Sequence, residues 1–97
     1  MIICEIEGKE YKLAITRRGL REAEKLGMKF TDMESKPMSM VYYLWYAALY
    51  ASQPMSMNKS DELLDKYLDS PNCPHTLVTL LDALSEEFNS VFGLAVE

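Results

Sequence analysis

The stretch PMSMVYYLWYAALYASQPMSMN, residues 37–58, contains no charged side chain, although 26% of the whole chain is charged. Aliphatic residues fall on one side of a helix drawn over it, and aromatic residues fall around the rest. We predict a helix over residues 37–52, which Pro37 opens in its first turn and Pro54 ends. Because this helix is apolar almost all round, it must be buried on more than one face.

The uninterrupted apolar and aromatic run, residues 40–51, is too short to span a membrane. At 1.5 Å per residue it is about 18 Å long as a helix, whereas a bilayer core is about 30 Å thick. Residues 1–7 lack the basic region of a secretory signal, and two cysteines are too few for a disulfide scaffold. We therefore expect a cytoplasmic protein that makes no membrane contact.

Residues 2–15 predict a β-hairpin that turns at Gly8 and Lys9, because glycine is typical of the first central position of a type II′ turn. This register places three apolar pairs on one face, namely Ile6 with Tyr11, Cys4 with Leu13, and Ile2 with Ile15. On the other face it pairs Glu5 with Lys12. Because a two-stranded hairpin is marginally stable alone, a helix should cover its apolar face.

Three further helices are predicted, over residues 17–26, 59–69 and 75–91. Thr16 is the expected N-cap of the first, and Asn58 or Ser60 that of the second. The apolar stripe of the first helix comprises Leu20, Ala23 and Leu26. The last helix carries apolar residues in steps of four and three, at Leu77, Leu81, Leu84, Phe88 and Val91. Of these, Leu81, Leu84 and Phe88 are the expected core residues.

The predicted fold class is α+β, with an N-terminal β-hairpin followed by about four α-helices packed as a small bundle. The 97 residues allow a single domain, 1–97. Residues 31–36 are polar and are expected to form a loop. The tetrapeptide PMSM occurs at 37–40 and again at 54–57, and we interpret both copies as entries from a loop into a helix.

The composition disfavours catalysis, metal binding and nucleic-acid binding. The chain has one histidine and four scattered glycines, so it lacks a phosphate loop, and its net charge of −5 opposes nucleic acid. The spacing of Cys73 and His75 with the distant Cys4 fits no familiar zinc pattern. We therefore expect no enzyme activity, no metal or other cofactor, and no small-molecule substrate.

Aromatic residues in the apolar helix suggest a protein partner. Tyr43, Trp45, Tyr46 and Tyr50 are the candidate contacts, because tyrosine and tryptophan are enriched at binding surfaces. Six methionines beyond the first residue lie between residues 28 and 57, and methionine-rich surfaces adapt to their partners. The alternative is that these side chains form the core of the domain.

The charges are unevenly distributed along the chain. Residues 1–36 hold eight Lys or Arg against seven Asp or Glu, whereas residues 37–97 hold two against eight. Arg17, Arg21 and Lys25 form a basic stripe that would meet the acidic helices of a second copy and build a homo-oligomer. The alternatives are pairing within the chain or a solvated stripe.

The order of segments resembles a known family. The segments IEGKEYKL (6–13) and RGLREAEKLG (18–27), an apolar helix, DELLDKYL (61–68) and an apolar, acidic last helix are similar to small tail assembly chaperones of tailed bacteriophages and prophages. The resemblance implies a non-enzymatic protein of the bacterial host cytoplasm. It also implies binding to the long, hydrophobic tape measure protein before the tail tube polymerises, and often a longer form made by ribosomal frameshifting.

Two other classes of function fit the same observations. One is a structural component of the virion, such as a head–tail joining or tail-terminator subunit. The other is a small host adaptor or antitoxin-like interaction domain, although Arg17, Arg18 and Arg21 are few for a DNA-binding helix.

Overall fold

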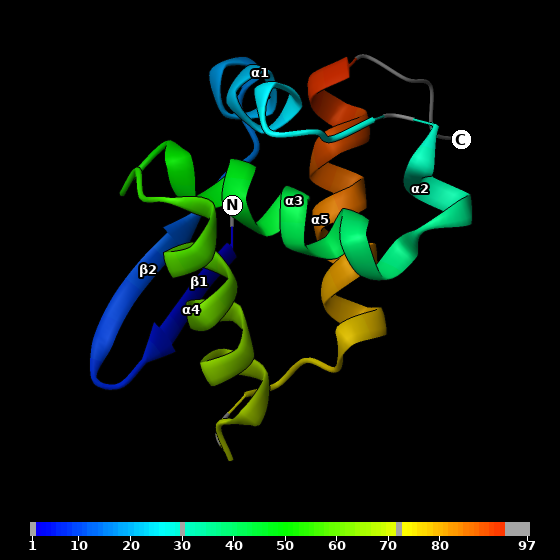
Figure 1. The fold of residues 1–97 in the computed structure, drawn as a ribbon. Helices are drawn as coiled ribbons and strands as arrows, with labels where there is room; N and C mark the ends of the chain where they lie inside the picture. The colour runs from blue at the N-terminus through cyan, green and yellow to red at the C-terminus, as the bar shows by residue number, and fades with distance from the viewer. Residues whose placement is uncertain (1, 30, 72, 93–97) are drawn as a thin grey trace.

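The computed structural model describes residues 2–29, 31–71 and 73–92. Their elements, in chain order, are β1 (Ile2–Ile6), β2 (Lys9–Leu13), α1 (Arg17–Lys25), α2 (Asp32–Ser35), α3 (Pro37–Tyr50), α4 (Met57–Asp69) and α5 (Leu77–Phe92). The α+β fold with an N-terminal hairpin is thereby confirmed. In Figure 1, α3 runs through the middle of the molecule, and it packs against the other four helices and β2.

Helix α3 supplies more of the core than any other element of the described chain. Its buried side chains are Met40, Val41, Leu44, Trp45, Tyr46, Ala47, Ala48 and Leu49. The expected burial on more than one face is confirmed, because neighbours on several sides remove this apolar surface from water. No helix among the described residues is long and apolar enough to cross a membrane.

The hairpin forms, but its predicted register is wrong by two residues. Glu7 and Gly8 occupy the turn with φ values of 52° and 79°, a combination that belongs to a type I′ turn. Ile2 therefore pairs with Leu13, Cys4 with Tyr11, and Glu5 with Glu10 rather than Lys12. Because side chains alternate with period two, a shift of two residues leaves the same side chains on the core face.

The chain leaves the hairpin after Leu13 because its backbone then finds partners in the helices. The N–H of Ala14 donates to the carbonyl oxygen of Ala48 at 3.2 Å. The N–H of Ile15 donates to Oε1 of Glu87 at 3.2 Å. Ile15 is consequently buried against the helices. The predicted pairing of Ile15 with Ile2 is wrong, because Ile2 pairs with Leu13.

Helix ends follow the caps that the side chains provide. The Thr16 hydroxyl accepts a hydrogen bond from the N–H of Gly19, as expected. Helix α4 begins earlier than predicted, because Ser56 is its N-cap and accepts from the N–H of Lys59. Ser60 is fully buried instead of capping. Both PMSM segments do lead into helices, at Pro37 and Met57.

The remaining differences from the predicted helices are local. Residues 32–35 form the short helix α2 where a loop was expected, and α3 ends at Tyr50 rather than residue 52. Leu26 lies outside the buried stripe of α1, because it is the C-cap of that helix and is 47% exposed.

Helix α5 begins at Leu77, after Thr76, whose hydroxyl accepts from the N–H of Thr79 at 3.2 Å. Its buried residues are Leu80, Leu84 and Phe88. Leu81, which was expected in the core, is only partly buried against it. The buried face is therefore centred one residue before the predicted one at this turn.

Gly19 lets α1 approach α3 closely. A Cβ at this position would lie 2.3 Å from the carbonyl oxygen of Ala47, which is backbone and cannot easily move away. The contact is thus made by the backbone of one helix against the other, beside the buried Ala23. This close approach holds the basic helix α1 on the apolar helix α3.

Candidate partner-binding surface

The four aromatic candidates on α3 separate into two buried and two partly exposed residues. Trp45 is completely buried and stacks on Tyr67 with ring centroids 5.6 Å apart, and Tyr46 is only 7% exposed. Their side chains belong to the core and are not presented to a partner in this structure. Tyr43 and Tyr50 are half-buried and remain accessible. The contact hypothesis therefore now rests on these two.

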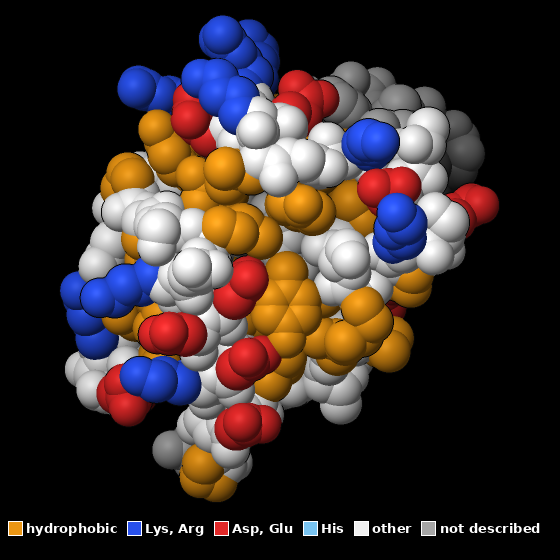
Figure 2. Space-filling model, in the orientation of Figure 1, with side chains coloured by type: hydrophobic (Ala, Val, Ile, Leu, Met, Phe, Trp, Pro, Cys, Tyr) orange, Lys and Arg blue, Asp and Glu red, His pale blue; other side chains and the backbone are white. Residues whose placement is uncertain are grey.

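Tyr43 lines a shallow hollow of about 430 Å³ between the first turns of α3 and α4. We call it the Tyr–Met hollow, and its lining residues are Met38, Ser39, Tyr42, Tyr43, Met57 and Asp61. Figure 2 shows hydrophobic side chains gathered in the middle of this face, beside a row of acidic side chains over α4. Tyr50 lies elsewhere, in a separate hollow with Thr16, Arg18, Ala51 and Pro54.

Hydrogen bonds fix both tyrosine rings of the Tyr–Met hollow. The hydroxyl of Tyr42 donates to Oδ1 of Asp65 at 2.5 Å, and the hydroxyl of Tyr43 donates to the carbonyl oxygen of Leu26 at 3.3 Å. The bond to Asp65, followed by burial, raises the pKa of Tyr42 to about 12. The phenol thus remains a protonated donor at neutral pH, and its ring remains one wall of the hollow.

The α4 side of the Tyr–Met hollow is acidic. Asp61, Asp65 and Asp69 follow one another at intervals of four residues, so they lie along one side of the helix. Burial, and then the charge of Asp65, raises the pKa of Asp61. Both effects penalise the ionised form of Asp61, so an approaching cation would relieve an unfavourable charge. The surface suits an apolar segment with basic side chains along one border.

The basic residues of α1 do not form one uniform stripe. The ammonium of Lys25 pairs with Glu22 of the same helix at 3.0 Å. Arg17 and Arg21, together with Glu24, instead border a groove of about 240 Å³ between α1 and α5. The apolar residues of this groove are Leu20, Met28, Phe88 and Val91. Two of the three basic residues of the predicted stripe therefore lie beside an apolar groove.

Three observations concern the metal-ligating and nucleophilic side chains of the described residues. They contain no group of three or more His, Cys, Asp or Glu side chains that would hold a metal ion. Burial raises the pKa of the Cys4 thiol to about 11, which suppresses its thiolate at neutral pH. The thiol of Cys73 donates to the carbonyl oxygen of His75 at 3.2 Å, so these neighbours meet through backbone rather than as a nucleophile and base.

Tyr42, Met38 and Met57 were not singled out by the sequence analysis. One partial signal was available in the repeated PMSM, although the two methionines are not equivalent: the first copy supplies Met38 from its second position, and the second copy supplies Met57 from its fourth. Entry into two neighbouring helices places both methionines at the same hollow. The pairing of Tyr42 with Asp65 had no such signal, since it joins residues that are far apart in the chain.

A family model matches residues 1–92, and its description is "Domain of unknown function (DUF5055)". Comparison with curated proteins gave no match, and neither did comparison with solved structures. The family match covers the hairpin and all of the described helices. The chain therefore belongs to the DUF5055 family.

Proposed function

We propose that this chain is a non-enzymatic tail assembly chaperone of a tailed phage or prophage, which binds the tape measure protein through the Tyr–Met hollow. The observation that carries the proposal is an accessible aromatic and methionine surface beside the acidic row of α4. The order of segments, which resembles such chaperones, supplies the identity of the partner.

The physical basis is the fit of an amphipathic helix into an adaptable hollow. Tyr42 and Tyr43 give rigid apolar area, because their hydroxyl groups are already hydrogen-bonded. Met38 and Met57 repack around different apolar side chains, as a chaperone for a long hydrophobic protein requires. Lys or Arg residues beside the apolar face of the partner would lie against the acidic row of α4.

Co-expression with the protein encoded by a very long downstream reading frame tests this proposal. Met38→Asp should abolish co-purification, because it places a charge in the hollow at a residue that is 57% exposed and contributes little to folding. Val78→Asp is the matched control, since Val78 is 67% exposed on α5 and lies outside the hollow. Equal co-purification of both variants would contradict the proposed surface.

The neighbouring genes provide a second test. We expect a tail-tube gene upstream, a very long open reading frame downstream, and a slippery heptamer near the 3′ end of this gene. If all three are missing, the chaperone proposal fails even if Met38→Asp weakens binding to some other protein.

One observation favours a structural virion subunit as the second candidate. The same chain carries the groove bordered by Arg17 and Arg21 and the acidic row of α4, and these would join head to tail between copies. Light scattering should then show oligomers that dissociate as salt rises. Arg21→Glu should prevent their formation, and the protein should be detectable in purified virions. A monomer at every salt concentration would remove this candidate.

A further inference from the structure

The two edges of the hairpin are covered to different extents. Since Glu7 and Gly8 form the turn, the hydrogen-bonded pairs include Ile6 with Lys9 and Cys4 with Tyr11. The backbone N–H and C=O groups of Ile3 and Glu5 therefore point away from β2. Within the described residues, no strand pairs with this outer edge of β1.

The opposite edge, on β2, is partly covered by the end of α3. The hydroxyl of Ser52 donates to the carbonyl oxygen of Lys12 at 2.8 Å. Just beyond β2, the N–H of Ala14 donates to Ala48. A strand that approached β2 would have to displace these contacts, whereas no strand of the described residues pairs with the outer edge of β1.

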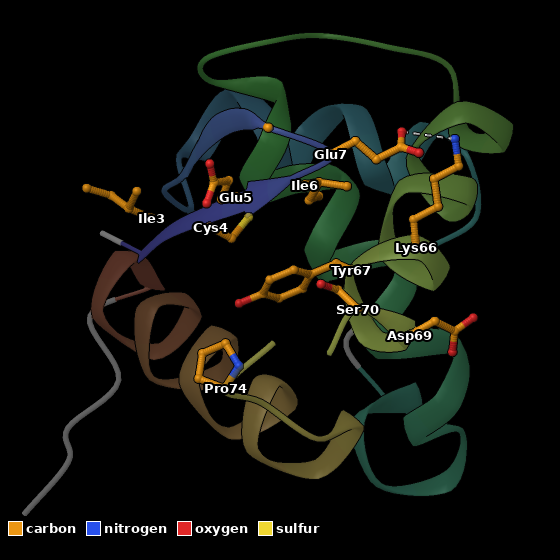
Figure 3. Close-up of a pocket in the computed structure, with 11 residues that line it drawn as sticks. Ile3, Cys4, Glu5, Ile6, Glu7, Lys66, Tyr67, Asp69, Ser70 and Pro74 are labelled. Atoms are coloured by element: carbon orange, nitrogen blue, oxygen red, sulfur yellow. Dashed lines mark hydrogen bonds and ion pairs between the residues drawn. The ribbon is translucent and has the colours of Figure 1, made fainter. Parts of the chain in front are cut away.

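A groove of about 670 Å³ runs along the open edge. One wall comprises every residue from 3 to 8, and such consecutive lining indicates a cavity beside the strand rather than over one face of it. The other wall comes from the end of α4 and the segment after it, including Tyr67, Ser70 and Pro74. Figure 3 shows this segment across the groove from β1.

Side chains divide the groove into an inner and an outer side. Figure 3 shows Cys4 directed toward Tyr67, whereas Glu5 is directed away from it. On the outer side, Ile3 is 56% exposed and Glu5 is exposed. A strand placed here would alternate between side chains that contact Tyr67 and side chains that lie beside Ile3 and Glu5.

Acidic groups dominate the groove. Glu5, Glu7 and Asp69 line it, and Lys66 is the one basic residue among the described residues that line it. The ammonium of Lys66 lies 3.4 Å from Oε1 of Glu7, so this lysine already forms an ion pair with one of the three carboxylates. The remaining carboxylates favour a ligand with basic side chains.

We propose that β1 binds an extended, basic segment of a partner protein as a third strand of the sheet. The backbone groups of Ile3 and Glu5 pair with the segment, and its Lys or Arg side chains lie on the outer side, beside Glu5. This site is separate from the Tyr–Met hollow, and the proposal does not rest on the tail-chaperone function.

A second copy of the chain fits the groove less well than a basic partner. Pairing β1 with β1 of another copy would bring two acidic grooves together and place Glu5 and Glu7 of both copies in one interface. Like charges across neighbouring strands are destabilising. We therefore commit to a basic segment from another protein, and dimerisation is one outcome of the test.

The first experiment uses a blocked, fluorescein-labelled Lys-Val-Lys-Val-Lys-Val-Lys peptide and fluorescence anisotropy with the full chain. Two control peptides have Glu in place of Lys, or N-methyl groups on alternate backbone amides. Both controls should bind at least about tenfold more weakly, because one loses charge complementarity and the other loses backbone hydrogen bonds. Equal binding of the N-methylated peptide would overturn strand pairing.

Glu5→Pro and Glu10→Pro form a matched pair of variants, because these residues are exposed and lie directly opposite each other in the hairpin. Each removes an N–H that points outward, at one edge only. Glu5→Pro should weaken peptide binding about tenfold, and Glu10→Pro should change it less than about twofold. Equal effects of the two variants would overturn the assignment to β1.

Hydrogen exchange of the unmodified protein keeps the proposal testable if Glu5→Pro fails to fold. The peptide should slow exchange at the amides of Ile3 and Glu5, but not at those of Glu10 and Lys12. No protection at Ile3 and Glu5 under saturating peptide overturns the proposal. The protein without peptide could also form a dimer that Glu5→Pro dissociates. That result would assign the edge of β1 to a second copy and would equally overturn the proposal. Met38→Asp should bind the peptide normally, which separates this result from the test of the Tyr–Met hollow.

Discussion

Two neighbouring pairs of aromatic residues on α3 have opposite environments. Tyr42 and Tyr43 line an accessible hollow, whereas Trp45 and Tyr46 lie in the core one turn further along the same helix. Tyrosine occurs in both pairs, so residue type alone does not tell an accessible position from a buried one. What differs is the neighbour, because Trp45 meets the ring of Tyr67 while Tyr42 meets a carboxylate of α4. The composition of a helix therefore shows how much surface must be covered, but not which side stays open.

Truncating an aromatic side chain to alanine should destabilise the protein most at the buried pair. Trp45→Ala is expected to lower the free energy of unfolding by about 3–5 kcal/mol, because it empties a fully buried site. Tyr43→Ala should cost about 1 kcal/mol, since its side chain is only half-buried. Urea denaturation of both variants measures the difference. Similar losses would mean that the two pairs do not differ in burial as described.

Leu80 and Leu81 on α5 offer the same comparison between a buried and a partly exposed neighbour, in a helix that lacks the cluster of aromatic residues. Leu80→Ala should cost about 2–5 kcal/mol in unfolding free energy, because Leu80 is completely buried. Leu81→Ala should cost about 1 kcal/mol, because Leu81 is only partly buried. Thermal and urea unfolding can rank them. A larger loss at Leu81 would restore the face that the sequence predicted and contradict the observed one.

The contact of α1 with α3 should resist even one added methyl group. Gly19→Ala is expected to lower the free energy of unfolding by about 1–3 kcal/mol, because its Cβ meets the backbone at Ala47. Alanine is otherwise the better helix former by about 1 kcal/mol. Arg18→Ala, at an exposed position of the same helix, is the control and should change stability by less than about 0.5 kcal/mol. A stabilised Gly19→Ala protein would show that the helices are further apart.

The smallest expected effect is a pH dependence of the free energy of unfolding, which arises from Tyr42 in the accessible pair. The pKa of Tyr42 is about 12 in the folded protein against an ordinary 10.0, so the folded state holds this proton more tightly. Its stabilisation is complete below pH 10 and is lost as the pH rises through about 12. Urea unfolding over this range should show a steeper decline for the unmodified protein than for Tyr42→Phe. Parallel declines would argue against the bond to Asp65.

Much of the fold could be predicted because local chemistry specifies it. Thr16 caps α1 as expected, and Pro37 opens α3. The hairpin face was also predicted correctly although its register was wrong, since a shift of two residues preserves the alternation of side chains. The register itself follows from the turn, which lies at Glu7 and Gly8 rather than at Gly8 and Lys9. Glycine suits the second position of a type I′ turn as well as the first of a type II′ turn, so Gly8 alone did not decide between the two registers.

The candidate site could be predicted only in part. Residue type predicted Tyr43 as a partner contact, but it predicted Trp45 and Tyr46 equally, and both are buried. The acidic border of the Tyr–Met hollow and the open groove beside β1 arise where α4 lies against other elements. The spacing of Asp61, Asp65 and Asp69 is visible in one segment, but the elements that face it come from elsewhere in the chain, so the sequence did not show what the row borders.

The sequence by itself determined that residues 37–58 are uncharged, that their helix must be buried, and that a hairpin with one apolar face precedes it. Hydrophobic patterning and capping are local properties, so one segment is enough to specify them. Tertiary structure alone decided which aromatic residues of α3 remain accessible and which hairpin edge remains open. Those outcomes depend on which helix covers which surface, and that is set by the packing of all the elements together.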